Sequence, residues 1–396
     1  MTLFDKFYPL AQARKEMEAQ CSDLFHITME EILSPTEAVI KGRPTLLAGT
    51  NNYLGLTFHP DCIAAARQAT EQEGTGTTGS RMANGTYAGH LALEKELSAF
   101  FGRSHTIVFS TGYLANLALL STIAGQDDVI LLDADCHASI YDGCRMGNAE
   151  VIRFRHNNVA DLEKRLRRLA SRKANVLIVV EGIYSMLGDQ APLKDIAELK
   201  RQYQAWLAVD EAHSLGVLGE SGRGLAEACG VEDEVDFLVG TFSKSLGATG
   251  GFCSSNHSGL QFLRYASRPY IFTASLSPAT IASARVALQI ISTDSSRRTT
   301  LWNHAHYLYE QLHSLGYAVG PTPGPVIAIR AGSTASAFNL WQGLLDQGVY
   351  VNMVLPPATP DGGALLRCSI SAAHSRKQVE QVAAAFARLT PNGPHA

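Results

Sequence analysis

A series of short apolar runs, each ending in polar residues, constrains the fold more than any other feature of the chain. The clearest run, 175–182, is continuous, which is typical of a strand buried on both faces of a parallel sheet. Similar runs lie at 107–110, 129–133, 206–210 and 235–239. Helical stretches follow several of them, so we expect an α/β fold with a mostly parallel sheet flanked by helices.

The stretch 235–251 places one lysine directly after such a run. The apolar residues 235–239 break into Gly240, Thr241 and Ser243, reach Lys244 and close on three glycines. We interpret it as a buried strand that delivers Lys244 into a glycine-lined pocket, where desolvation lowers the pKa of an amine that can attack carbonyls. From this stretch alone, a turn with a solvated lysine fits equally well.

A second run, 206–210, ends on Asp210. The carboxyl ends of parallel strands form the ligand crevice of an α/β sheet, so Asp210 and Lys244 should emerge on the same rim. Side chains alternate along a strand, so only one of Asp210 and Glu211 can face the site. A Schiff-base lysine and an aspartate at the ring nitrogen are the two fixed points of a pyridoxal phosphate (PLP) enzyme. The alternative is an aspartate that caps the next turn.

The segments Val209-Asp-Glu-Ala-His213 and Gly240-Thr-Phe-Ser-Lys-Ser245 resemble the α-oxoamine synthase family of fold-type I PLP enzymes. The likeness runs from about Phe25 to about Ser371. It implies a large PLP-binding domain, a smaller α+β C-terminal domain and a homodimer with shared active sites. It also implies that the enzyme condenses an amino acid with an acyl-CoA and releases carbon dioxide.

Further segments are most similar to the branch of the family that joins L-serine to a long-chain, palmitoyl-CoA-like donor, giving 3-ketodihydrosphinganine. They are 34–40, 139–143, 184–189, 268–275 and 351–353 with 356–360. That branch has an arginine just before its Pro-Pro-Ala-Thr-Pro segment, where this chain has Leu355. Another α-oxoamine synthase, using glycine or alanine with a different acyl-CoA or acyl carrier thioester, therefore remains open. A non-catalytic partner subunit is a third hypothesis, and the intact Lys244 argues against it.

Polar residues at the strand ends complete the expected cofactor site. The run 107–110 enters a helix through Ser-Thr-Gly, and free amides at a helix N-terminus make Gly112 and Tyr113 candidates for the cofactor phosphate. The resemblance implies that His137 stacks on the pyridine ring. It adds cofactor contacts at Asp210, Ser185, His213, Thr241, Ser243 and, toward the neighbouring subunit's cofactor, Thr273.

The resemblance also implies catalytic roles for Lys244, Asp210, His137 and His213. Lys244 would remove the α-proton of the substrate, and Asp210 would stabilise the resulting negative charge through the ring. Arg367 lies in the apolar run 365–370, where a guanidinium is costly unless paired, and a substrate carboxylate would pair it. Asn52 is expected near the same carboxylate. A structural salt bridge for Arg367 and a turn role for Asn52 are the alternatives.

Composition excludes several other classes of function. The 396 residues are 46% hydrophobic and 18% charged, with a net charge of -4 and a pI near 6.4, which argues against a nucleic-acid or anionic-membrane surface. The N-terminus lacks the apolar core of a signal peptide, and the longest apolar stretch, 113–124, is too short to cross a bilayer. We expect a cytoplasmic protein. Seven scattered cysteines suit reduced thiols, and no Cys-x-x-Cys pair indicates a metal.

The expected domain organisation has four parts. They are an N-terminal helix and arm (1–45), the large domain (46–280), a linking helix with the small C-terminal domain (281–390) and a tail (391–396). The linking helix should run from about Pro278 towards Leu315. In the small domain we expect strands at 326–330, 349–353 and 365–370 and helices at 335–345 and 377–389.

Overall fold

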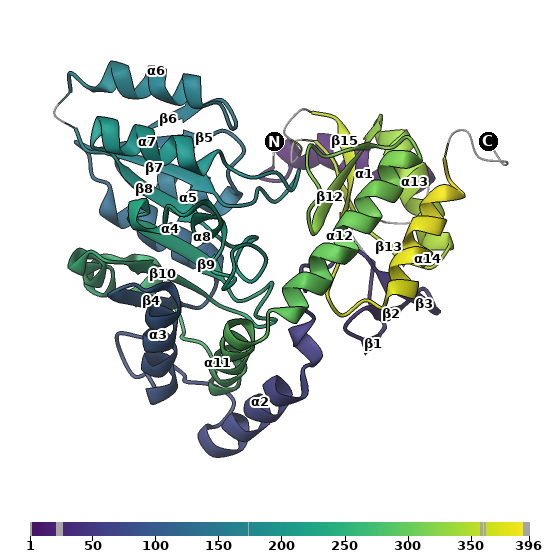
Figure 1. Cartoon of the computed structure of the whole chain (residues 1–396), viewed down its shortest axis with the longest axis horizontal. Helices are drawn as coiled ribbons and strands as arrows, with labels where there is room; N and C mark the ends of the chain where they lie inside the picture. The colour runs from purple at the N-terminus through teal and green to yellow at the C-terminus, as the bar shows by residue number, and fades with distance from the viewer. Residues whose placement is uncertain (1, 21–26, 173, 357–358, 360–361, 391–396) are drawn as a thin grey trace.

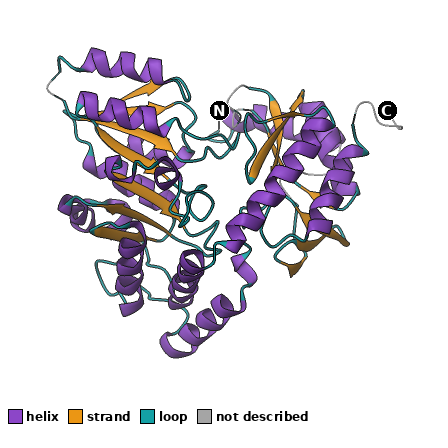
Figure 2. Cartoon of the chain, viewed as in Figure 1, coloured by secondary structure: helices purple, strands orange, loops and turns teal. Residues whose placement is uncertain are grey.

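A seven-stranded sheet lies inside the larger part of the protein, on the left in Figures 1 and 2, as the computed structural model shows for residues 2–20, 27–172, 174–356, 359 and 362–390. Its strand order is β4-β10-β9-β8-β7-β5-β6. Phe25, where the resemblance begins, and the expected tail 391–396 lie outside the described residues.

The five apolar runs form five of the seven strands, as predicted, whereas the strands at 150–154 and 251–255 were not predicted. Strands β5 to β9 are parallel to one another, and β10 is antiparallel to both β4 and β9. The strands are β4 (His105–Phe109), β5 (Val129–Asp133), β6 (Glu150–Phe154), β7 (Val176–Glu181), β8 (Trp206–Asp210), β9 (Phe237–Thr241) and β10 (Gly251–Ser255). All are largely buried except β6, the edge strand.

Helices cover both faces of the sheet (Figure 1). Helices α4 (Gly112–Ile123) and α5 (Ala138–Met146) pack together on one face, and α6 (Val159–Leu169) and α7 (Leu193–Tyr203) cover the other, as right-handed crossovers require. Asn158 caps α6 by accepting the Asp161 N–H at 2.8 Å. The other helices here are α2 (Pro60–Glu73), α3 (Ala88–Phe101), α8 (Leu225–Cys229), α9 (Leu263–Ala266) and α10 (Arg268–Ile271).

The linking helix is two helices, α11 (Pro278–Thr293) and α12 (Ser296–Ser314), rather than the single one expected. Asp294 separates them because its carboxylate accepts the Ser296 N–H at 2.9 Å. A short aspartate side chain that bonds nearby backbone competes with helix continuation.

The C-terminal part contains a second, antiparallel sheet of order β11-β12-β15-β14, which packs against α12 and α13 (Thr334–Asp346), and α14 (Arg376–Ala387) packs on α12. Its strands are β11 (Ala318–Val319), β12 (Val326–Gly332), β14 (Asn352–Val354) and β15 (Ala364–Ser369). The strand expected at 349–353 is divided: β13 (Val349–Tyr350) pairs with β3, whereas β14 pairs with β15.

Strands near the N-terminus join this C-terminal part. Strands β1 (Glu31–Ser34), β2 (Glu37–Ile40) and β3 (Arg43–Leu47) form a third sheet with β13, and helix α1 (Tyr8–Gln20) precedes them. Burial alternates along β2, with Ala38 and Ile40 inward, as in a strand with one face on a core. The division of the chain at residues 45 and 280 stays a prediction. Within the described ranges, no helix is both long and apolar enough to span a membrane.

Candidate active site

The carboxyl ends of β7, β8 and β9 and the start of α4 surround a cavity of about 230 Å³. Strand register brings them together, because Glu181 pairs with Asp210 and Asp210 with Val239 in adjacent parallel strands. Most of the expected site residues line this cavity: Gly112, Tyr113, His137, Asp210, His213, Thr241, Ser243 and Lys244.

Lys244 lies just beyond β9 in a loop closed by hydrogen bonds. Phe242 N–H donates to the Gly250 carbonyl at 2.9 Å, and Ala248 N–H donates to the Phe242 carbonyl at 2.9 Å. A Cβ on Gly250, whose φ is +140°, would lie 2.3 Å from the Phe242 ring, so the loop requires glycine there. Burial lowers the pKa of Lys244 to about 8, against the opposing charge of Asp210. Part of the amine is therefore uncharged near neutral pH.

Both carboxylate oxygens of Asp210 accept hydrogen bonds from the protein. Oδ2 accepts from Asn116 Nδ2 at 2.7 Å, and Oδ1 accepts from the Ala212 N–H at 2.9 Å. Asn116 also donates to Ser139 Oγ at 3.0 Å, which lies 2.8 Å from His137 Nδ1. One chain of hydrogen bonds therefore orients both Asp210 and His137.

Glu211 points away from the cavity, as the alternation along β8 requires. Its carboxylate accepts the N–H groups of Leu225 and Ala226, each at 2.9 Å, at the start of α8. The prediction that only one of the two acidic residues faces the site is confirmed.

The first turn of α4 offers backbone donors at the edge of the cavity. Thr111 caps the helix by accepting the Leu114 N–H at 3.0 Å, and the first N–H groups of any helix have no intrahelical acceptor. A Cβ on Gly112 would lie 2.8 Å from Thr241 Cβ, so glycine keeps this edge open. The side chain of Tyr113 is oriented by a hydrogen bond on the exposed side of the cavity, where its hydroxyl donates to Asp142. Such a helix start suits an anion.

His213 is buried beside Tyr53, with Nδ1 2.7 Å from the Tyr53 hydroxyl. Burial, reinforced by the positive charges of Lys244 and Arg367, holds the pKa of His213 well below its usual range. The imidazole is therefore neutral at physiological pH.

Four expected residues lie outside the lining of the cavity: Ser185, Thr273, Asn52 and Arg367. Ser185 and Arg367 are nevertheless joined, because Arg367 Nε donates to the Ser185 carbonyl at 2.6 Å. The Asn52 amide donates to Thr57 Oγ1 at 2.8 Å, and its Oδ1 is buried with no partner among the described residues. Thr273 is half-buried in the segment after α10.

Arg367 is 5% exposed, and its guanidinium contacts neutral groups in the described part of the chain. They are Asn51 Oδ1 at 3.0 Å, Ser369 Oγ at 3.0 Å, the Tyr53 hydroxyl at 3.3 Å and the Ser185 carbonyl. The structural salt bridge considered for it is not seen there. Leu355 is partly buried against the hydrophobic core. Pro357 and Ala358, in the segment that follows, lie outside the described residues.

Sequence reasoning missed four buried polar residues of the site: Asn116, Ser139, Glu181 and Tyr53. Glu181 ends β7, and its carboxylate accepts the His137 N–H. Burial, then the charge of Asp210, raises the pKa of Glu181 well above its usual range. Glu181 could have been predicted as a site residue, because it lies at the end of the apolar run 175–182. The sequence around Asn116, Ser139 and Tyr53 gives no such indication.

Two larger cavities lie away from these residues. One of about 620 Å³ lies between α2, α3 and α11, and one of about 480 Å³ lies beside Trp206 at the start of β8. Neither of them brings together as many buried titratable groups as the cavity lined by Lys244 and Asp210. The smaller cavity is therefore the candidate active site.

Known proteins are similar to this chain over almost its whole length. A serine palmitoyltransferase of Caulobacter vibrioides is 53% identical over 389 residues, which cover 98% of this chain and 96% of that protein. The structure of Sphingomonas wittichii serine palmitoyltransferase matches with a TM-score of 0.95 at 51% identity, covering 98% of both chains. A serine palmitoyltransferase of S. paucimobilis, solved with a bound PLP–myriocin aldimine, matches with a TM-score of 0.96 at 48% identity and the same coverage.

The fold expected from the resemblance is therefore confirmed. The family model described as aminotransferase class I and II matches residues 44–386, which include every residue of the candidate site named above. The chain belongs to the aminotransferase class I and II family.

Proposed function

We propose that the protein is a PLP-dependent C-acyltransferase that condenses L-serine with a long-chain acyl-CoA, as its relatives' name describes. The observation that carries the proposal is one cavity that holds a lysine of lowered pKa, a buried aspartate and the open start of a helix. The reaction forms a bond between the serine Cα and the thioester carbonyl and breaks the C–S bond. Loss of the serine carboxylate as carbon dioxide leaves 3-ketodihydrosphinganine and free CoA.

The residues present fit PLP. The cradle at Gly112, which a Cβ would fill, suits the phosphate, and the hydroxyls of Thr241 and Ser243, 2.9 Å apart, lie at the same edge. Asp210 would face the ring nitrogen and His137 the ring. When bound, PLP supplies an electron sink next to the substrate nitrogen. In a dimer, Thr273 would reach the phosphate bound by the other subunit.

Asp210 and Lys244 have distinct tasks in this site. Asn116 and the Ala212 N–H hold Asp210 as an oriented carboxylate that can keep a ring nitrogen protonated. The amine of Lys244 first holds the cofactor and, once released by the substrate, takes the α-proton. A pKa near 8 suits both tasks, since the free amine is then accessible at neutral pH and its ammonium is formed readily.

Arg367 and Asn52 would bind the substrate carboxylate. Arg367 is buried among neutral groups, and Asn52 Oδ1 has no partner among the described residues, so a ligand at this place would satisfy both. Leu355 stands where the serine-using branch has an arginine, so carboxylate binding falls to these two residues. We further propose a cytoplasmic homodimer as the working form.

The experiment is a panel of amino acids and acyl-CoA lengths offered to the purified holoenzyme, with CoA release and the visible spectrum of the cofactor as readouts. We expect serine to change the spectrum and to release CoA with palmitoyl-CoA. If glycine or alanine does both and serine does neither, the protein is a different synthase of the same chemistry, and Leu355 is the first residue to examine.

A further inference from the structure

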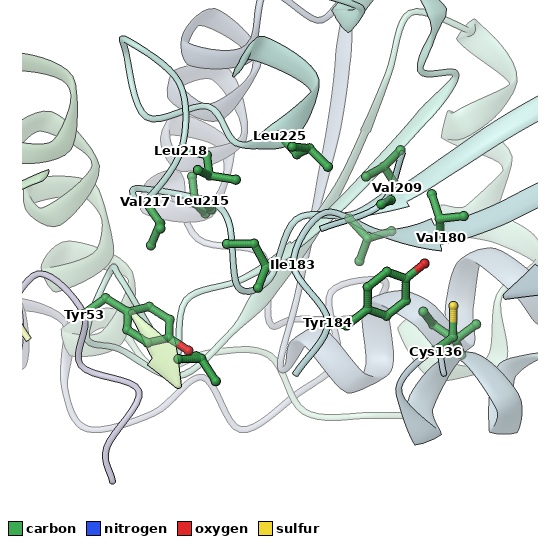
Figure 3. Packing of buried hydrophobic residues seen from close by; sticks show 14 of the residues in the cluster. Tyr53, Cys136, Val180, Ile183, Tyr184, Val209, Leu215, Val217, Leu218 and Leu225 are labelled. Atoms are coloured by element: carbon green, nitrogen blue, oxygen red, sulfur yellow. The ribbon is translucent and has the colours of Figure 1, made fainter. Parts of the chain in front are cut away.

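Tyr53 joins two residues of the site that are far apart in the sequence. Its side chain is 0% exposed, and Figure 3 shows it within the buried cluster that also holds Ile183 and Val217. Its hydroxyl lies 2.7 Å from His213 Nδ1 and 3.3 Å from Arg367 Nη2. Because this hydroxyl is buried between an imidazole and a guanidinium, its hydrogen bonds determine which nitrogen of the imidazole carries the proton.

The hydrogen-bond roles follow from what each group can donate. A guanidinium only donates, so the Tyr53 oxygen accepts from Arg367 and keeps one proton to give. Asn51 Oδ1 is the other acceptor in reach of the hydroxyl, but its contact of 3.3 Å is much longer than the 2.7 Å contact with His213 Nδ1. The shorter contact, to His213 Nδ1, therefore receives the proton. Because His213 is neutral and Nδ1 accepts, its single N–H is on Nε2.

We propose that Tyr53 is a positioning residue that fixes His213 as its Nε2–H tautomer and couples it to Arg367. The inference rests on the proposed function. In that function the Nε2–H of His213 is a hydrogen-bond donor in the cavity, and Arg367 holds the substrate carboxylate. At 3.3 Å, the hydrogen bond to Tyr53 is longer than those that Arg367 donates to Ser185, Asn51 and Ser369. Arg367 can turn toward a carboxylate without loss of the Tyr53–His213 bond.

The test compares the wild-type holoenzyme with Tyr53→Phe and with the matched control Tyr317→Phe. Tyr317 also donates a hydrogen bond to a backbone carbonyl, that of Phe386 at 2.9 Å, but it is half-buried and lies in the C-terminal part, away from the cavity. Nitrogen-15 NMR of histidine-labelled protein reports the tautomer, with the His213 signals assigned from their loss in His213→Gln. Serine affinity is read from the cofactor spectrum, and kcat from CoA release.

We expect an unprotonated Nδ1 on His213 in the wild type and in Tyr317→Phe, and a protonated Nδ1 in a substantial share of Tyr53→Phe. Serine affinity should fall about tenfold in Tyr53→Phe alone, the equivalent of a lost hydrogen bond to a charged group. A wild-type His213 protonated on Nδ1 overturns the proposal even if Tyr53→Phe does not fold. So does a Tyr53→Phe protein with unchanged tautomer and serine affinity, whatever its thermal stability. An enzyme that shows the tautomer change but never condenses serine would refute the proposed function and leave the Tyr53–His213 pair intact.

Discussion

Asn116 donates a 2.7 Å hydrogen bond to Asp210 from a helix that contributes no other side chain to that carboxylate. The same amide donates to Ser139, which contacts His137, so one asparagine orients groups expected on two sides of the cofactor ring. Hydrogen bonds to a carboxylate are among the stronger ones in proteins.

Asn116→Ala should therefore weaken PLP binding about tenfold and lower kcat, because Asp210 loses one of its two protein donors. Equilibrium titration of apoenzyme with PLP measures the first effect. The control is Asn175→Ala, which removes a 2.8 Å hydrogen bond to Asp128 at the exposed end of a strand. Equal PLP affinity in both variants would show that Asn116 has no role in orienting Asp210.

Gly112→Ala should reduce PLP affinity more severely, since the new Cβ would lie 2.8 Å from Thr241 Cβ at the proposed phosphate cradle. The protein should still fold, because the neighbouring cavity offers room for adjustment. Gly125→Ala is the matched control, with its nearest atom at 3.6 Å. Inorganic phosphate competition against PLP would locate the effect, and an unchanged affinity for both ligands in Gly112→Ala would contradict the cradle.

The lowered pKa of Lys244 predicts how reconstitution depends on pH. An amine attacks a carbonyl only when unprotonated, so the rate at which apoenzyme incorporates PLP should rise through a midpoint near pH 8, the value to which burial lowers the pKa. Stopped-flow absorbance across this range measures the rate. A flat profile would mean that the amine is not the titrating group, and a midpoint near the ordinary lysine pKa would mean that Lys244 is solvated.

A cluster next to the site predicts the pH dependence of stability. Burial lowers the pKa of His156, but hydrogen bonds to Asp133 at 2.8 Å and Asp189 at 2.7 Å raise it to about 10. A folded pKa above the unfolded value of about 6.5 stabilises the protein fully below that pH, and the contribution is lost as pH rises toward the folded value. His156→Gln should therefore cost at least about 2 kcal/mol in free energy of unfolding at pH 6 and less at pH 9.

Urea denaturation of the wild type and His156→Gln at both pH values checks this expectation. His306→Gln is the control, because His306 is exposed on α12. A difference between wild type and His156→Gln that grows with pH would show that His156 is neutral in the folded protein.

The five apolar runs of the main sheet and the polar residues at their ends could be predicted because the signal is local; the strands at 150–154 and 251–255 were not predicted. Each apolar run ends where polar residues begin, which places Asp210 and Lys244 on one rim without any knowledge of distant contacts. The division of 349–353 between two sheets could not be predicted, since both halves read as one strand and only their partners differ.

Asn116 and Tyr53 escaped prediction for a related reason. Asn116 lies in the most apolar stretch of the chain, and its partner Asp210 is 94 residues away; Tyr53 and His213 are 160 residues apart. The role of a buried polar side chain depends on the hydrogen-bond partners that the tertiary structure brings to it, and a single sequence does not show those partners.

The most direct test of the account is to locate the lysine that holds the cofactor. Holoenzyme treated with borohydride fixes PLP covalently to its lysine, and peptide mass spectrometry then identifies the modified residue. We predict a single modified peptide containing Lys244 and no internal-aldimine band in folded Lys244→Ala. Modification of any other lysine, or an internal-aldimine band retained in Lys244→Ala, would contradict the account.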